Sequence, residues 1–186
     1  MKKYRLIFYC SILAFLHIEA QVNTYSPYSY FGLGDLVNTS STMNISMGGG
    51  GVSLSNNNTL NYINPASYPF LNQTAFEIGA HTSFSTISKE DIKQKNFTSN
   101  LSNLGLGFPI APKIAMSAAL IPYSTVGYNV ISTSFSSEIG TTTYNYNGSG
   151  GLNKFLLGAG WRMRDNIAIG VNWNWFFGSI YKNVII

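Results

Sequence analysis

The amino-acid sequence predicts an all-β protein whose antiparallel strands cross a membrane as part of a β-barrel. Several segments alternate strictly between apolar and small or polar residues, which makes one face of a strand apolar. Charged residues make up only 10% of the chain, against about 25% in typical soluble domains. Aromatic residues reach 15% and gather near the ends of the alternating segments, as in the girdles of membrane barrels. A soluble β-sandwich also buries one face, so the low charge of the other face favours the membrane.

The clearest alternation runs from residue 150 to residue 179. In its first arm one face carries Phe155, Leu157, Ala159 and Trp161, and the other carries Lys154, Leu156, Gly158, Gly160 and Arg162. Residues 163–166 form a polar turn. The second arm has Ile167, Ile169, Val171, Trp173, Trp175 and Phe177 on one side, against Ala168, Gly170, Asn172, Asn174 and Phe176. Each arm supplies the ~9–11 residues that a membrane-crossing strand needs.

Further strands are predicted at residues 75–85, 101–110 and 114–135, the last interrupted at Pro122. A fourth strand follows a turn at 138–141 and ends in the first arm above, so about five strands can be read. The connections at 111–113 and 163–166 are short, whereas the stretches 86–100 and 122–150 are long and polar and are interpreted as loops. Short turns on one side and long loops on the other are typical of outer-membrane barrels.

Residues 1–20 have the composition of a secretory signal peptide. A basic start (Lys2, Lys3, Arg5) precedes an apolar stretch too short to span a bilayer, and cleavage is expected near Ala20. An uncleaved anchor is the alternative. Removing these residues leaves 8 Lys+Arg and 6 Asp+Glu, a net charge of +2 instead of +4. The remaining chain has no basic stripe, so no nucleic-acid partner is expected. The expected location is the bacterial outer membrane.

No catalytic or metal site is predicted. The sole cysteine, Cys10, lies in the signal peptide, so the mature chain has no thiol chemistry. His81 shares a strand face with Glu77 and Ser83, but two-residue steps along a strand separate side chains by ~7 Å, beyond the reach of a base and its nucleophile. One histidine alone makes no metal site. Glu77, His81, Asn172 and Asn174 are therefore interpreted as residues that line a lumen, and no cofactor is expected.

Residues 21–74 differ from the rest of the chain, being rich in Asn, Ser, Tyr and Gly with little alternation. Four consecutive glycines, Gly48, Gly49, Gly50 and Gly51, permit backbone conformations closed to other residues. They lack the Lys-Ser/Thr of a phosphate-binding loop. Asn64, Pro65 and Ala66 begin either a turn or a short helix with Asn64 as its cap and Pro65 at its first position.

Three stretches, residues 47–71, 106–128 and 148–180, together resemble the N-terminal part of a FadL-type outer-membrane transport protein of the Bacteroidetes kind. The resemblance implies a fourteen-stranded barrel whose N-terminal segment, here residues 21–74, folds inward as a hatch. The residues that match the hatch motif are Gly48, Gly49, Gly50, Gly51, Asn64, Pro65 and Ala66. The resemblance also implies uptake of hydrophobic small molecules such as long-chain fatty acids, with membrane lipid and that ligand as partners.

Pro122 is the candidate for a lateral gate. Proline cannot donate to a strand ladder, so Pro122 and the flexible Gly127 are hypothesised to form a kink through which an apolar ligand leaves into lipid, as the resemblance implies. The alternative is that Pro122 only ends a strand in an exposed loop.

About five strands are too few for a closed barrel, because the smallest single-chain bacterial barrels have eight. An open sheet edge in lipid costs several kcal/mol for each unpaired group. The chain is therefore expected to be a fragment, a truncated product or one part of a barrel completed by strands of a longer chain or other subunits. Two other functions stay open: a non-transport barrel serving as scaffold or secretion-machinery component, and a secreted soluble β-sandwich.

Overall fold

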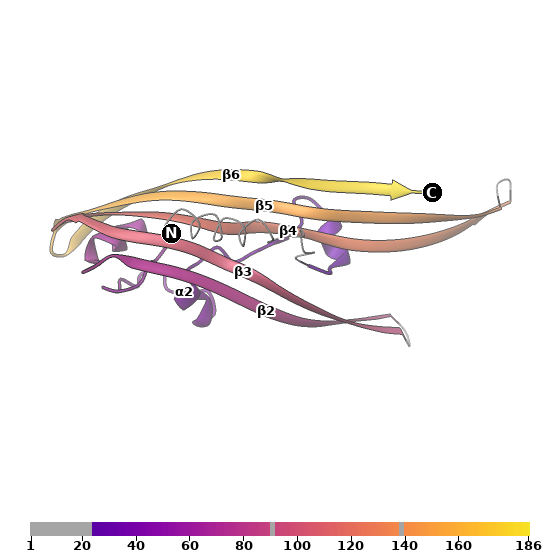
Figure 1. Ribbon diagram of the computed structural model, residues 1–186, viewed down its shortest axis with the longest axis horizontal. Helices are drawn as coiled ribbons and strands as arrows, with labels where there is room; N and C mark the ends of the chain where they lie inside the picture. The colour runs from indigo at the N-terminus through magenta and orange to yellow at the C-terminus, as the bar shows by residue number, and fades with distance from the viewer. Residues whose placement is uncertain (1–23, 90–91, 138–139) are drawn as a thin grey trace, which may run out of the picture.

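The computed structural model describes residues 24–89, 92–137 and 140–186 (Figure 1). The predicted signal peptide and its cleavage near Ala20 lie outside these residues. The elements in chain order are η1 (Pro27–Tyr30), β1 (Asp35–Leu36), α2 (Thr42–Ser46), η2 (Pro65–Phe70), β2 (Ala75–Lys89), β3 (Ile92–Ala111), β4 (Ile114–Ser136), β5 (Gly140–Arg164) and β6 (Ile167–Ile185).

The strands form one antiparallel sheet in the order β2-β3-β4-β5-β6, and the short β1 pairs with β4. This confirms the predicted all-β antiparallel fold. The sheet is not closed, because its outermost strands β2 and β6 do not pair with each other in the described residues. No helix in this part of the chain is long and apolar enough to cross a membrane.

Apart from residue 137, the described residues of the two stretches interpreted as long loops lie in strands, and that expectation was wrong. β2 and β3 stay paired as far as Lys89↔Ile92, and β4 and β5 as far as Ser136↔Gly140. These distal stretches are rich in Ser, Thr and Asn and carry little hydrophobic alternation. They pair because main-chain hydrogen bonds continue the register that the hairpin already sets. The short turns 112–113 and 165–166 at the opposite end of the sheet are confirmed.

β4 runs through Pro122 without ending there. Its register with β5 shifts between Pro122 and Ser124, which leaves Tyr123 as the extra residue of a bulge. Proline is tolerated at a bulge because no ladder donor is needed there. The alternative that Pro122 ends a strand in an exposed loop is therefore wrong.

The apolar residues of the alternating segments line up across the sheet on its outer face. One row is Phe76, Leu106, Ala118, Leu157 and Trp173, and the next is Ile78, Leu104, Leu120, Phe155 and Trp175. Many are well exposed, with Phe76 at 67% and Trp175 at 58%. The face assignments made for residues 150–179 are thus confirmed, and the outer face presents a continuous apolar surface.

The inner face is covered by residues 24–74, called here the N-terminal segment, which lies along β2–β4 in Figure 1. The core between them contains Leu60, Tyr62, Tyr68, Leu71, Ala75, Ala115, Ala119, Ile121 and Leu156. Glycines of the sheet give this segment room: a Cβ added to Gly105 would strike the Tyr62 hydroxyl, and one on Gly158 the Tyr68 ring. A Cβ on Gly160 would lie 2.6 Å from Pro69 Cδ. Close approach, rather than turn geometry, explains these glycines.

Candidate functional site

Glu77 is the centre of a polar network that joins the N-terminal segment to the inner face. Its Oε1 accepts hydrogen bonds from the backbone N–H of Thr42 (2.5 Å) and from Asn103 Nδ2 (2.6 Å). The Tyr62 hydroxyl lies 3.4 Å from Oε2, and the Thr42 hydroxyl donates to Asn103 Oδ1 at 2.8 Å. Bonds to an ionised carboxylate are about twice as strong as neutral ones. The network therefore ties the start of α2 to β2 and β3.

Two buried tyrosines share this interface. Burial raises the pKa of the Tyr62 phenol, and the negative charge of Glu77 raises it further. Burial also raises the pKa of Tyr68 to about 12, although its hydrogen bond with Asn172 acts the other way. Both hydroxyls are therefore neutral donors at physiological pH.

Asn172 of β6 holds the other end of the N-terminal segment. Its Oδ1 accepts from the Tyr68 hydroxyl at 3.1 Å, and its Nδ2 donates to the Tyr62 carbonyl oxygen at 2.8 Å. Asn174 pairs with Leu156 across the ladder and is exposed. Of the four residues interpreted as lumen-lining, Glu77 and Asn172 thus contact the N-terminal segment directly.

The residues assigned to the hatch motif have local structural tasks. Asn64 caps η2, since its Oδ1 accepts from the Ala66 N–H at 3.1 Å, with Pro65 at the first position; of the two alternatives, this is the short helix. Gly48 (φ +77°) and Gly49 (φ +82°) end α2, where their N–H groups donate to the carbonyls of Ile45 and Asn44. Gly50 and Gly51 follow, and the Gly51 carbonyl accepts from Asn61 Nδ2 at 2.8 Å.

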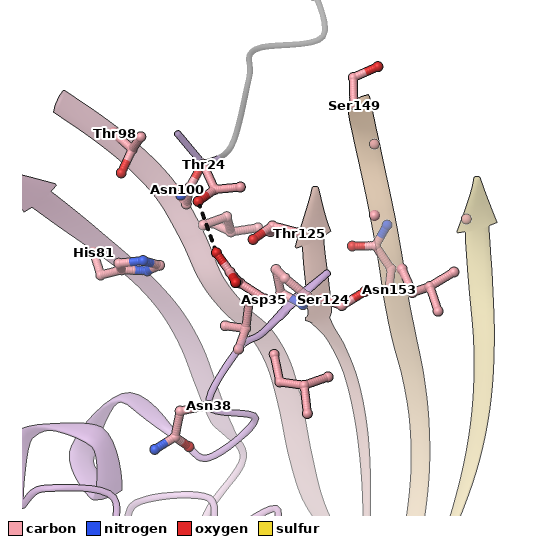
Figure 2. Close-up of a pocket in the computed structure, with 18 of the residues that line it drawn as sticks. Thr24, Asp35, Asn38, His81, Thr98, Asn100, Ser124, Thr125, Ser149 and Asn153 are labelled. Atoms are coloured by element: carbon pink, nitrogen blue, oxygen red, sulfur yellow. Dashed lines mark hydrogen bonds between the residues drawn. The ribbon is translucent and has the colours of Figure 1, made fainter. Parts of the chain in front are cut away.

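A cleft of about 1340 Å³ opens where β3 and β4 separate. Figure 2 shows polar side chains of β2, β3, β4 and β5 surrounding it, with Asp35 of β1 between them. Its lining is largely uncharged, with Ser83, Thr98, Ser124, Ser149 and Asn153 among the polar residues. His81 also lines the cleft, and its Nδ1 lies 3.2 Å from Ser102 Oγ. Such a surface can form many neutral hydrogen bonds.

The N-terminal segment already occupies part of this cleft. β1 pairs with β4 at Asp35↔Thr125 and Leu36↔Ser124. The Ser26 N–H donates to the Gly127 carbonyl at 3.0 Å, and the Val37 N–H to the Tyr123 carbonyl at 2.9 Å. Gly127 N–H donates to Ser29 Oγ. Pro122 and Gly127, the residues of the proposed gate, therefore border a short stretch of β4 that is held by the chain's own N-terminal segment.

Sequence reasoning missed both β1 and the Glu77 network. β1 has only two residues, too few for any alternation to be visible. The network joins residues 15 to 61 positions apart, a distance at which single-sequence patterns carry no information. The sequence did contain one sign that another segment packs against the inner face, which is the spacing of Gly105–Gly107 and Gly158–Gly160. Small residues repeated at every second position of a strand mark a face that another segment approaches closely. No group of three His, Cys, Asp or Glu that could hold a metal occurs among the described residues.

Fold and site together define an all-β protein with an open antiparallel sheet, whose inner face is closed by its own N-terminal segment. The chain belongs to the BamG family, whose model matches residues 1–186. No curated protein and no solved structure matches it significantly.

Family membership corrects two expectations, the resemblance and the transport function. The resemblance to FadL-type transporters was wrong, because the family that matches the whole chain is BamG. The expected uptake of fatty acids or other hydrophobic small molecules was wrong for the same reason. The lateral gate hypothesised at Pro122 and Gly127 therefore has no transported ligand to release. The family implies association with the outer membrane and with other protein subunits, but no hydrophobic ligand.

Proposed function

We propose that this protein is a non-transport component of the machinery that assembles outer-membrane proteins, the BAM complex for which the family is named. The observation that carries the proposal is the match of residues 1–186 to the BamG family. On this proposal the protein works by binding other subunits. This is the alternative of a scaffold or machinery component that the sequence left open.

The packing of the N-terminal segment supports a fixed role rather than a moving plug. Tyr68 is 1% exposed, and Leu60 and Tyr62 are nearly as buried. Hydrogen bonds from Thr42, Tyr62 and Tyr68 hold the segment to both halves of the sheet, through Glu77 and Asn172. Moving it would expose this core and leave buried polar groups unpaired, each costing about 1–3 kcal/mol. A scaffold gains from that rigidity, whereas a channel would have to overcome it.

The open sheet offers surfaces to other subunits. β2 and β6 each have one edge without a partner strand in the described residues, and unpaired edges are templates for strand addition. The exposed apolar outer face gives a second surface, suited to membrane lipid or to an apolar protein partner. Export with cleavage near Ala20 is part of the proposal, and sequencing the mature N-terminus tests it by finding Gln21 first.

The proposal is tested by depleting the protein in its native host. We expect the steady-state amounts of outer-membrane β-barrel proteins to fall while their transcripts and fatty-acid uptake stay unchanged. A tagged copy should co-purify, in mild detergent, with subunits of the assembly complex. Loss of fatty-acid uptake with normal barrel-protein amounts, or release of the protein as a free soluble monomer, would overturn the proposal.

A further inference from the structure

The sheet divides into two halves, because β3 and β4 pair only near the short turn that connects them. These strands pair only from Ala111↔Ile114 to Leu104↔Leu120. Yet β3 continues with β2 to Lys89↔Ile92, and β4 continues with β5 to Ser136↔Gly140. Figure 1 shows the β2–β3 hairpin diverging from β4, β5 and β6. Each diverging strand therefore turns one main-chain edge toward the cleft.

The orientation of the β4 edge follows from its contacts. Both the N–H and the carbonyl of Gly127 point away from β5, to the side of the β3–β4 gap, since they bond to Ser29 Oγ and to the Ser26 N–H of the N-terminal segment. Main-chain groups of alternate residues point to the same edge, and the β4–β5 register has no shift from Ser124 to Ser136. Asn129, Ile131, Thr133 and Phe135 thus direct their N–H and C=O groups toward the same side. No described segment pairs with β4 beyond Gly127 on that side.

We propose that the cleft between β3 and β4 binds an extended strand of another chain by β-augmentation. The occupant is an amphipathic strand of an outer-membrane β-barrel protein. β1 is the internal precedent, since two of its residues already add to this edge of β4. The remaining edge, residues 128–136, is long enough for a strand of ordinary length. Main-chain hydrogen bonds would supply affinity and the flanking side chains selectivity.

The two faces around the cleft match such a strand. On the inner side the lining residues His81, Ser83 and Thr98 are polar. On the outer side Ile131 is 66% exposed, Phe135 79% and Phe97 57%. A strand inserted here would place alternate side chains on the two faces, and only one that is polar inside and apolar outside satisfies both. Strands of membrane barrels have that alternation. The class of partner rests on the proposed function, whereas the strand-binding geometry does not.

Site-specific photocrosslinking in the native host tests the inference. A photoreactive benzoylphenylalanine is placed at Thr98, inside the cleft, and as a control at Val171 on the outer face, in the full-length protein. We expect adducts at position 98, mapped by mass spectrometry to a membrane-spanning strand of a β-barrel protein, and not at position 171. Ile131→Pro removes one cleft-facing donor and should reduce the adduct about fivefold, the equivalent of one hydrogen bond. Ile131→Val keeps the donor and should leave the adduct unchanged.

Several outcomes would overturn the inference. These are no adduct at position 98, equal adducts at positions 98 and 171, adducts at position 98 only within the same chain, or an adduct that Ile131→Pro leaves at full yield. Thr133→Pro has the same edge orientation and provides a second variant if Ile131→Pro does not accumulate in the membrane. Co-purification with the assembly complex is measured in the same strains. If co-purification persists without cleft adducts, only the strand-binding inference fails; if co-purification is also lost in unaltered protein, the proposed function fails.

Discussion

Replacing Glu77 tests whether the polar network holds the N-terminal segment on the sheet. Glu77→Ala leaves the Thr42 N–H, Asn103 Nδ2 and the Tyr62 hydroxyl without their acceptor. Asn103 and Tyr62 are buried, at 0% and 3% exposure, so water does not replace the lost partner. Two short bonds to a charged group are worth about 1.5–3 kcal/mol each, so we expect a loss of roughly 3–5 kcal/mol. Glu77→Gln keeps an acceptor oxygen and should cost about 1–2 kcal/mol.

Limited proteolysis of the purified protein in detergent measures the effect. When opening and closing are fast, cleavage of the N-terminal segment follows the population of its open form. A change of 3–5 kcal/mol then accelerates cleavage by roughly two to four orders of magnitude. Asp165→Ala removes a carboxylate from the exposed β5–β6 turn and should cleave like the unaltered protein. Equal cleavage rates for Glu77→Ala, Glu77→Gln and the unaltered protein would refute the reasoning.

Four further predictions concern the packing of the two faces. Tyr68→Phe should destabilise the protein by about 1 kcal/mol, because Asn172 loses a donor, and Tyr68→Ala by about 3–5 kcal/mol; denaturant unfolding measures both, and equal midpoints would contradict them. Gly160→Leu should displace Pro69 and make the N-terminal segment protease-sensitive, whereas Ala159→Leu on the outer face should not. Raising the pH from 10 to about 12 should cost on the order of 2 kcal/mol from Tyr68 alone, with Tyr62 adding to the loss, because both phenols keep their protons in the folded state while the unfolded chain loses them; stability that holds constant across this window would argue against buried phenols. Val171→Lys should reduce outer-membrane yield by placing a charge on the apolar face, at ~2–4 kcal/mol if that face meets lipid, while Val171→Leu should leave the yield as it is.

Much of the sheet could be predicted because its information is local. The alternation at residues 150–179 needs only neighbouring positions, and it assigned Trp173 and Gly158 to opposite faces correctly. The cap of η2 is equally local, since Asn64 bonds to the N–H of Ala66 two residues later. The family could not be predicted in this way. The FadL resemblance rested on amphipathic strands preceded by a glycine-rich segment, and this member of the BamG family has the same pattern.

The sequence by itself thus determined the strands near the short turns, their faces and the apolar outer surface. Only the tertiary structure decided how far the hairpins extend, where β3 leaves β4, and that Glu77 and Asn172 hold the N-terminal segment. The physical reason is the range of the interactions. Side-chain alternation is set residue by residue, whereas the Tyr68–Asn172 bond spans 104 positions and forms only after the sheet has brought β6 beside η2.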